Sequence, residues 1–470
     1  MIKFGTGGWG ALIGEDFTKE NVCLVAQGVV ELMKEEGKTD LPVMIGYDRR
    51  FLSESAAKWV AGVFAANGIQ SWFMRRSAPT PLVMHTVKEK NLHYGIEITA
   101  SHNPYSYNGI KLIVEEGRDA AVECTERLES LITTASVQEI SFEQAVEKGF
   151  VTYLKAPFND FLDSILSRLD VETIRKADLR ILFDSMHGSA TYPMMAMLYT
   201  ARCTIDVMNS NKDGYFGGKM PAPGYHQSAA LRHRVATEGY DLGIEVDGDG
   251  DRIAIIDKDG SYIESNRILV MLYYYLHEYR GWKGAVVRNL ATTHMLDKVA
   301  QSFGEICYEV PVGFKYISSK LDETDAVLGG ESSGGLTVRG HIFGKDSIYA
   351  AGLLVEMIAA TGKSVGEFWR ELTNRYGEYV MVEDNLRFSF SEKEEVERIL
   401  VQEKRIPEFE GKTLVKVGYD DGTKFYFDDE AFVICRFSGT EPLLRIFAED
   451  KTEGGARALI DSVKALLSLS

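Results

Sequence analysis

The sequence predicts an α/β protein: three similar α/β domains with mixed, mostly parallel sheets, followed by a C-terminal α+β domain. Three observations lead to this prediction. Apolar, β-rich runs alternate with amphipathic helical stretches, which is the pattern of βαβ units. The same order of strands and loops recurs three times along the chain. After about residue 376 this order gives way to short strands and two helices.

The first segment shows the pattern most clearly. A β-rich run over 43–47 lies between two stretches with apolar residues at helical spacing, 20–35 and 53–67. Gly68 follows the second stretch and is a signal for the end of a helix. A second strand is expected over 71–74.

The repeat is defined by three sets of matching strands. The first strands are expected over 43–47, 179–183 and 284–288, and the second strands over 71–74, 204–207 and 307–310. The third strands begin near residues 94, 242 and 326, and each runs into a loop rich in Gly or Ser. Ligands of parallel sheets bind outside the carboxyl ends of the strands, so the three loops are expected to form three walls of one site. Chance similarity between parallel strands is the alternative.

The tail after residue 376 has a different character. Short strands are expected over 414–417, 425–427 and 431–436, with helices near 392–404 and 453–467. This mixture predicts a separate α+β domain.

Composition limits the classes of function. Lys and Arg number 52 and Asp and Glu number 69, so the net charge is −17. Such a chain has no broad positive surface for nucleic acid, although a local cationic pocket could still bind a small phosphorylated substrate. The five cysteines are scattered without a CxxC pair, which fits a reducing cytoplasm. The start lacks the features of a signal peptide, and no apolar run is long enough to span a membrane.

The segment 247–252, Asp-Gly-Asp-Gly-Asp-Arg, places three carboxylates at alternate positions in a loop. The glycines let the backbone curl, so Asp247, Asp249 and Asp251 can converge on a hard cation such as Mg²⁺. The residues at the sixth and twelfth positions exclude an EF-hand loop. An ordinary Asp/Gly turn is the alternative.

The segment 99–104, Thr-Ala-Ser-His-Asn-Pro, follows an apolar strand and ends in a turn. Ser101 is a candidate nucleophile or phosphate carrier and His102 a candidate base, although a histidine beside a turn is more often structural. Lys111 follows ten residues later. A surface lysine without a functional role is the alternative.

The segment 436–445 gathers cations and hydroxyl groups in an otherwise acidic chain. Arg436 and Arg445 flank Ser438, Gly439 and Thr440. Arginine forks, hydroxyls and glycine N–H groups are the parts of a phosphate-binding loop. An ordinary hairpin turn is the alternative.

Two further motifs match known patterns by letter only. Residues 5–10 match GxGxxG, but no strand of useful length precedes them and no convincing helix follows. Residues 330–334 match GxSxG, but a strand-like run follows where a nucleophile elbow requires a helix.

Taken in order, the segments 99–104, 247–252, 329–334 and 436–442 resemble the four motifs of the α-D-phosphohexomutases, in the phosphoglucomutase/phosphomannomutase branch. The resemblance covers essentially the whole chain. It implies four domains around a central active-site cleft, expected here over 1–155, 156–257, 258–375 and 376–470.

The resemblance also implies roles for residues of this chain. Ser101 is expected to carry the phosphoryl group and, with Asp247, Asp249 and Asp251, to bind Mg²⁺. Lys111 is expected to act as general base, with Arg252 and His102 as further catalytic candidates. The expected substrate-binding residues are Lys315, Glu331, Ser333, His341, Lys345, Arg436, Ser438, Gly439, Thr440 and Arg445.

The implied activity is the interconversion of hexose 1-phosphate and hexose 6-phosphate through a phosphoserine and a bisphosphorylated sugar. Glucose is the first expectation and mannose the second, with hexose 1,6-bisphosphate as activator, in a cytoplasmic monomer or homodimer that binds neither nucleic acid nor membrane. One departure stands out, because Gly10 occupies a position where relatives commonly have Arg. This departure makes a catalytically impaired sugar-phosphate-binding homologue one alternative. A metal-dependent sugar phosphatase that uses Ser101 as nucleophile is the other.

Overall fold

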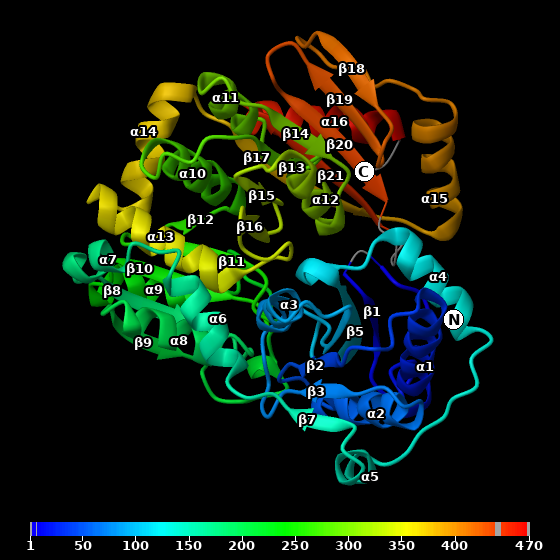
Figure 1. Cartoon of the computed structure of the whole chain (residues 1–470). Coiled ribbons are helices and arrows are strands. Elements are labelled where there is room, and N and C mark those ends of the chain that lie inside the picture. The colour runs from blue at the N-terminus through cyan, green and yellow to red at the C-terminus, as the bar shows by residue number, and fades with distance from the viewer. Residues whose placement is uncertain (1, 6, 438–442, 468–470) are drawn as a thin grey trace.

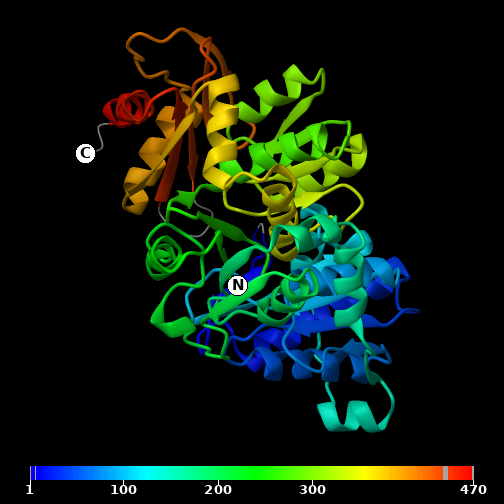
Figure 2. The same ribbon diagram turned by 90° about the vertical axis from the view of Figure 1, so that its left-hand side faces the viewer.

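The computed structural model describes residues 2–5, 7–437 and 443–467 and contains four sheets that follow one another along the chain. Figure 1 shows the C-terminal sheet (orange to red) beside the third unit and away from the end of the molecule that carries α5. Figure 2 shows from a second side that this C-terminal unit projects from the rest. We call the units that carry the four sheets domains I to IV.

The sheet of domain I has the order β1-β5-β4-β2-β3-β7, with β6 paired to β5. Strands β4, β2, β3 and β7 are parallel, whereas β5 is antiparallel to both β4 and β1. The strands are β1 (Trp9–Leu12), β2 (Val43–Tyr47), β3 (Ser71–Phe73), β4 (Tyr94–Ile98), β5 (Tyr107–Val114), β6 (Arg118–Asp119) and β7 (Val151–Tyr153).

The helices of domain I cover both faces of its sheet. They are α1 (Lys19–Glu36), α2 (Ser53–Ala66), α3 (Thr80–Glu89), α4 (Val122–Ile132) and α5 (Phe142–Glu147). Helix α1 contacts α2 and α4, whereas α3 contacts β2 and β4. Helix α1 begins where the Thr18 side chain accepts a hydrogen bond from the Asn21 amide and ends at Gly37, whose φ of 68° favours glycine.

Domains II and III repeat the strand order of domain I, as the sequence predicts. Each unit contains a first strand flanked by the second and third strands in parallel, and an antiparallel strand beyond the third. The three orders are β5-β4-β2-β3, β11-β10-β8-β9 and β16-β15-β13-β14. The carboxyl ends of the three repeated strand sets therefore carry equivalent loops.

Domain II begins with the helices α6 (Pro157–Leu166) and α7 (Val171–Ala177), and its further elements come after them. They are β8 (Arg180–Asp184), α8 (Thr191–Thr200), β9 (Thr204–Met208), α9 (Ala229–Glu238), β10 (Leu242–Val246), β11 (Ile253–Asp257) and β12 (Tyr262–Ile263). Those of domain III are α10 (Ser265–Glu278), β13 (Val286–Asn289), α11 (Met295–Ser302), β14 (Cys307–Val310), α12 (Phe314–Thr324), β15 (Leu328–Gly330), β16 (Leu336–Val338), α13 (Ser347–Thr361) and α14 (Val365–Tyr376).

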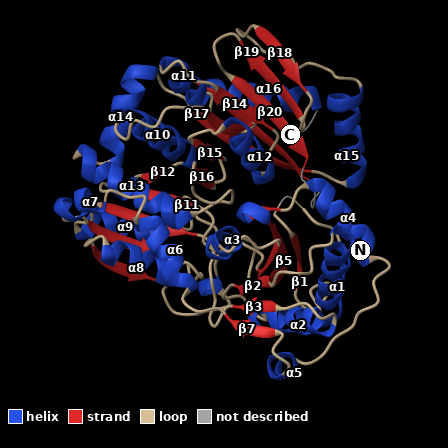
Figure 3. Ribbon diagram, viewed as in Figure 1, coloured by secondary structure: helices blue, strands red, loops and turns tan. Residues whose placement is uncertain are grey.

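Domain IV has an antiparallel sheet of order β17-β21-β20-β19-β18 with two helices, which agrees with the predicted α+β tail. Its elements are β17 (Val380–Arg387), α15 (Phe390–Glu397), β18 (Leu414–Gly418), β19 (Thr423–Phe427), β20 (Phe432–Phe437), β21 (Leu443–Asp450) and α16 (Glu453–Leu467). The expected helix near 392–404 is present, as α15 followed directly by a π-helical turn (Arg398–Gln402). Figure 3 shows the helices packed around the four sheets.

The buried apolar residues divide into one large core and several smaller ones. The large core runs continuously through the first three domains, whereas domain IV has a core of its own between its sheet and α16. A small cluster of Leu290, Ala291, Phe432 and Ile434 joins domains III and IV. Domain IV therefore contacts domain III without sharing its main core.

Within the described ranges, no single helix is long and apolar enough to cross a membrane. Helices α13 and α14 reach that length and hydropathy only as a pair bent by 78°. Most residues of α13 are buried inside the protein.

Candidate active site

The loop after β4 presents Ser101 in a constrained conformation. Strand β4 is buried along its whole length. Ser101 has a φ of 51° in the left-handed region, which residues other than glycine adopt only where neighbours enforce it. Its amide donates a hydrogen bond to Thr99 Oγ1 at 2.9 Å. The serine side chain is thereby held at the edge of the sheet where ligands of parallel strands bind.

Arg50 fixes the backbone of this serine loop. Its guanidinium donates hydrogen bonds at 2.5–3.1 Å to four carbonyl oxygens, those of Ser101, Asn103, Pro104 and Tyr107. The buried carboxylate of Asp48 lies 3.2 Å from Arg50 Nε and accepts a bond from Thr99 Oγ1 at 2.7 Å. We did not predict that Asp48 and Arg50 hold the serine loop, although their place just after β2 is the signal that could have identified this role.

The three aspartates of the loop after β10 converge as predicted from their spacing. One carboxylate oxygen of each of Asp247, Asp249 and Asp251 lies within 4.8 Å of the others, and all three residues are buried. Asp247 Oδ1 accepts hydrogen bonds from the amides of Asp251 (2.9 Å) and Arg252 (3.0 Å), which curl the loop. A Cβ at Gly248 would lie 3.0 Å from Ser101 O, so glycine allows the two loops to approach.

The serine and acidic loops meet directly. Ser101 Oγ donates to Asp247 Oδ2 at 3.2 Å, across the boundary between domains I and II. Thr80, the first residue of α3, donates its hydroxyl to Asp249 Oδ2 at 2.6 Å and its amide to the Asp249 carbonyl. Thr80 is a further supporting residue that we did not predict.

Two lysines from different domains contact the aspartate carboxylates. Lys111 on β5 donates to Asp249 Oδ2 at 2.7 Å and to Asp251 Oδ2 at 2.8 Å, so it is a buried site residue and not a surface lysine. Lys345 of domain III lies 3.0 Å from Asp251 Oδ2. It reaches this position across Gly335, where a Cβ would lie 2.1 Å from Lys345 Cδ.

Burial and charge perturb the ionisation of this cluster. Burial, together with Asp249 and Asp251, raises the pKa of Asp247 well above its ordinary value. Burial also disfavours the charged form of Asp251, but Lys111, Lys345 and Arg252 outweigh it and hold the pKa of Asp251 well below its ordinary value. Paired carboxylates that must stay close to one another require such compensating cations.

The aspartate cluster fits a divalent cation. Asp249 Oδ1 and Asp251 Oδ1 are buried and have no hydrogen-bond partner among the described residues. Buried oxygens without partners cost free energy, which a bound cation would recover. Carboxylate oxygens are also the ligands that Mg²⁺ prefers.

His102 and Arg252 border the cluster. His102 Nδ1 lies 3.4 Å from Ser101 Oγ. Burial, with Arg252 and Lys345 nearby, lowers the pKa of His102 to about 3, so its ring is neutral at physiological pH. Arg252 Nε lies 3.9 Å from Asp251 Oδ1.

The loop after β15 carries the expected sugar-binding residues. The carboxylate of Glu331 is held at Oε1 by Asn289 Nδ2 (3.0 Å) and by the Gly313 amide (3.1 Å). Ser333 is exposed at the tip of the loop. We did not predict Asn289, which ends β13 at the same sheet edge.

Lys315 and His341 have different surroundings. Lys315, near the start of α12, faces domain I: burial lowers its pKa, and Glu123 and Asp119 oppose that shift. His341 is almost fully buried; its Nε2 lies 2.7 Å from Asp346 Oδ2, and its ring packs against Tyr349. The described contacts of the His341 side chain therefore do not include the aspartate cluster.

Arg436 and Arg445 lie opposite each other on β20 and β21 of domain IV. Arg436 is paired with Asp421, with a closest approach of 2.8 Å between Nη2 and Oδ2. Ser438, Gly439 and Thr440 lie outside the described residues. Asp421 offsets the charge of Arg436, and two guanidinium groups at facing positions of one strand pair are suited to hold an anion such as phosphate.

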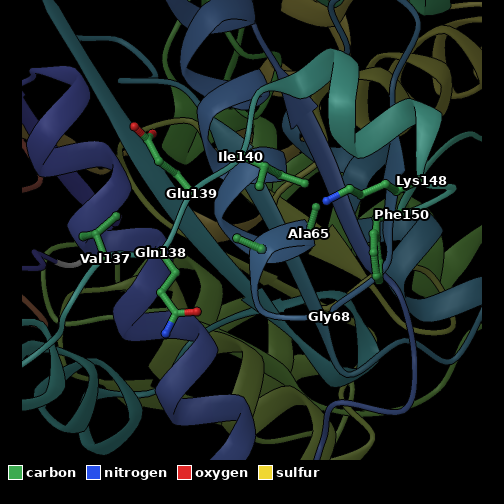
Figure 4. Close-up of a pocket in the computed structure, with 9 residues that line it drawn as sticks. Ala65, Gly68, Val137, Gln138, Glu139, Ile140, Lys148 and Phe150 are labelled. Carbon is green, nitrogen blue, oxygen red and sulfur yellow. The ribbon is translucent and has the colours of Figure 1, made fainter.

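A concave surface elsewhere contains none of these residues. Figure 4 shows it between the end of α2 and the segment 137–150. Its one carboxylate, Glu139, is already paired with Lys19 at 2.9 Å. No group of catalytic type converges there.

The serine loop, the aspartate cluster and the loop after β15, carried on three repeated α/β units and a fourth domain, define a member of the α-D-phosphohexomutase superfamily. Three sequence families match successive parts of the chain. They are the phosphoglucomutase/phosphomannomutase α/β/α domains I, II and III, over residues 1–139, 159–260 and 264–376. The chain belongs to the phosphoglucomutase/phosphomannomutase family, a family of isomerases.

Full-length relatives agree with this assignment. The chain is 28% identical to a phosphoglucomutase/phosphomannomutase of Thermococcus kodakarensis, over 97% of this chain and 96% of the relative. It is 27% identical to a phosphoglucosamine/phosphogalactosamine mutase of Sulfurisphaera tokodaii, over 99% and 98% of the two chains. A crystal structure assigned as a phosphomannomutase of Thermus thermophilus has a TM-score of 0.85 and 26% identity, with 99% of both chains covered.

Proposed function

We propose that this chain interconverts hexose 1-phosphate and hexose 6-phosphate through a phosphorylated Ser101 and a bisphosphorylated sugar, with glucose as the preferred hexose and mannose as the next. The observation that carries this proposal is the 3.2 Å contact between Ser101 Oγ and Asp247 Oδ2. It brings a constrained serine to a buried cluster of three carboxylates. The proposed place of action is the cytoplasm.

The transfer comprises two balanced steps. A hydroxyl oxygen of the sugar monophosphate attacks the phosphorus on Ser101, the bond from phosphorus to Ser101 Oγ breaks, and the hydroxyl proton passes to a base. The bisphosphate then reorients and Ser101 Oγ attacks its other phosphate. The bond from that phosphorus to the sugar oxygen breaks, and a proton returns to this oxygen. Positioning and electrostatic stabilisation supply most of the catalysis in phosphoryl transfer.

The residues around Ser101 supply charge and orientation. Asp247, Asp249 and Asp251 would hold Mg²⁺, which when bound supplies positive charge beside the transferring phosphoryl group. Arg252 and Lys345 border the same place. Arg50 keeps the serine loop fixed during the exchange.

Two residues, Lys111 and His102, are candidates for the base that accepts the proton of the attacking hydroxyl group. Burial alone would lower the pKa of Lys111, but Asp249 and Asp251 raise it well above its ordinary value, so Lys111 is protonated where it lies. A role as general base requires that another cation first neutralise these carboxylates. His102 is neutral and lies beside Ser101 Oγ, which suits it to accept or orient a proton.

Glu331 and Ser333 are proposed to bind the sugar hydroxyls, and Arg436 and Arg445 the phosphate that does not react. Lys315 is proposed as a further substrate contact. The relatives named above act on glucose, mannose, glucosamine or galactosamine phosphates by name, so the test includes several hexoses.

The test is a turnover assay with hexose 1-phosphates of glucose, mannose and glucosamine, in the presence of Mg²⁺ and a trace of the matching hexose 1,6-bisphosphate. We expect the 6-phosphate as product, fastest with glucose. Stoichiometric release of inorganic phosphate in place of the 6-phosphate would instead identify a phosphatase.

A further inference from the structure

A chain of hydrogen bonds through Asp421 connects domain IV to residues 331–335 of domain III, the loop proposed above to bind the sugar and called here the sugar loop. This residue lies in the turn between β18 and β19. Its Oδ2 accepts a hydrogen bond from Arg436 Nε at 3.0 Å and lies 2.8 Å from Arg436 Nη2. Its Oδ2 also accepts the amide of Val312, in domain III, at 2.8 Å. One side chain therefore holds the proposed phosphate-binding arginine and a backbone segment of the neighbouring domain.

The turn that carries Asp421 is fixed against β20. Gly422, the next residue, has a φ of 92°. A Cβ there would lie 2.2 Å from Cys435 O and 3.0 Å from Arg436 Cγ. Only glycine permits this approach, which sets the Asp421 carboxylate beside the Arg436 guanidinium.

We call the contacts of Asp421 with Arg436 and with the Val312 amide the bridge. On the domain III side, the residue after Val312 contacts the sugar loop. Gly313 follows Val312, and its amide donates to Glu331 Oε1 at 3.1 Å. Asn289 donates to the same oxygen at 3.0 Å. Two successive amides thus connect the Asp421 carboxylate with the Glu331 carboxylate.

The interface around the bridge is well anchored. Lys424 of β19 is buried and donates to the Leu290 carbonyl and to Glu309 Oε2, both at 2.7 Å. Leu290 itself packs on Phe432 and Ile434 of domain IV. Residues 289 and 290 therefore contact the sugar loop and domain IV at adjacent positions.

From this arrangement we infer that Asp421 is a positioning residue that couples the phosphate-binding arginine of domain IV to the sugar-binding carboxylate of domain III. Asp421 acts through Arg436 and through the 312–313 backbone, so that Arg436 and Glu331 meet a phosphosugar in one fixed arrangement. The inference rests on the proposed function, because it assigns Arg436 and Glu331 to one ligand.

The test compares Asp421→Ala and Asp421→Asn with Asp420→Ala, a matched control at the exposed neighbouring position. For Asp421→Ala we expect KM for the preferred hexose 1-phosphate to rise about tenfold or more, the effect of losing hydrogen bonds to a charged group, with a much smaller change in kcat. Asp421→Asn keeps an acceptor for the Val312 amide but loses the charge beside Arg436, so its KM should lie between those of the parent and the alanine variant. Asp420→Ala should leave both parameters unchanged.

Hydrogen exchange provides a readout that does not depend on catalysis. In Asp421→Ala the amides of Val312 and Gly313 should exchange faster than in the parent, whereas segment 242–252 should be unaffected. Faster exchange at Val312 alone, with Gly313 and KM unchanged, overturns the coupling, as does parent-like exchange at both amides. If the parent converts no hexose phosphate at all, the proposed function fails, while the exchange data still decide whether the bridge exists.

Discussion

The ammonium group of Lys111 lies 2.7 Å from Asp249 Oδ2, in the middle of the cluster that is suited to a divalent cation. Both side chains are buried. The lysine is therefore an internal counter-charge for carboxylates that would otherwise repel one another.

In the absence of Mg²⁺, replacing Lys111 by Met should lower the free energy of unfolding by about 3–5 kcal/mol, because it leaves buried carboxylate charges uncompensated. Mg²⁺ should recover much of this loss, so the thermal midpoint of the variant should rise more on Mg²⁺ addition than that of the parent. Calorimetry with and without Mg²⁺ measures both increments. Equal increments would show that Lys111 and the cation do not share these carboxylates.

Gly335→Ala should displace Lys345, since the new Cβ would overlap its side chain at 2.1 Å. We expect loss of the Lys345–Asp251 contact and a fall in kcat/KM of about tenfold or more, the effect of a lost charged hydrogen bond. A double-mutant cycle with Lys345→Ala provides the check. The two substitutions together should cost little more than Lys345→Ala alone, and fully additive effects would contradict the explanation.

Glu245 in β10 should make stability depend on pH. Burial, with Asp184 nearby, raises its pKa to about 8, against an ordinary value of 4.5. The folded protein thus binds a proton that the unfolded chain releases, so this contribution is complete below pH 4.5 and is lost as pH rises to about 8. The slope is at most about 1.4 kcal/mol per pH unit.

Unfolding of Glu245→Gln at pH 6 and pH 8 tests this effect. The variant should show a smaller decrease in stability between the two pH values than the parent. Glu172→Gln is the control, because the Glu172 side chain is 70% exposed in the same region. An identical decrease in Glu245→Gln and parent would exclude Glu245 as the source.

Gly10 lies on β1, and among the described residues a Cβ there would meet only Asn103 Nδ2, at 3.6 Å, an ordinary van der Waals distance. Asn103 belongs to the serine loop, so an arginine at position 10 can place its charge near Ser101. We expect Gly10→Arg to turn over hexose phosphate faster than the parent by up to about 10²-fold, the range of one transition-state charge contact. Gly10→Met, of similar length but uncharged, should give no gain, and a gain equal to that of Gly10→Arg would argue against a charge effect.

The repeated strands of the first three domains and the α+β character of the tail could be predicted, because strand periodicity and the Gly- and Ser-rich loops are local signals. The convergence of Asp247, Asp249 and Asp251 could also be predicted, since their spacing within one loop determines it. The contacts made by supporting residues such as Arg50 and Asp421 could not be predicted in this way. Their partners lie 51 positions away for Arg50 and Ser101, and 109 for Asp421 and Val312. Only the folded arrangement brings such groups together.

The central claim is that Ser101 carries the phosphoryl group between two positions of a hexose. The most direct measurement is the conversion of glucose 1-phosphate to glucose 6-phosphate with Mg²⁺ and a trace of glucose 1,6-bisphosphate, for the parent and Ser101→Ala side by side. We expect the parent to form the 6-phosphate and Ser101→Ala to lose nearly all of this activity while remaining folded. Undiminished conversion by Ser101→Ala would contradict the account.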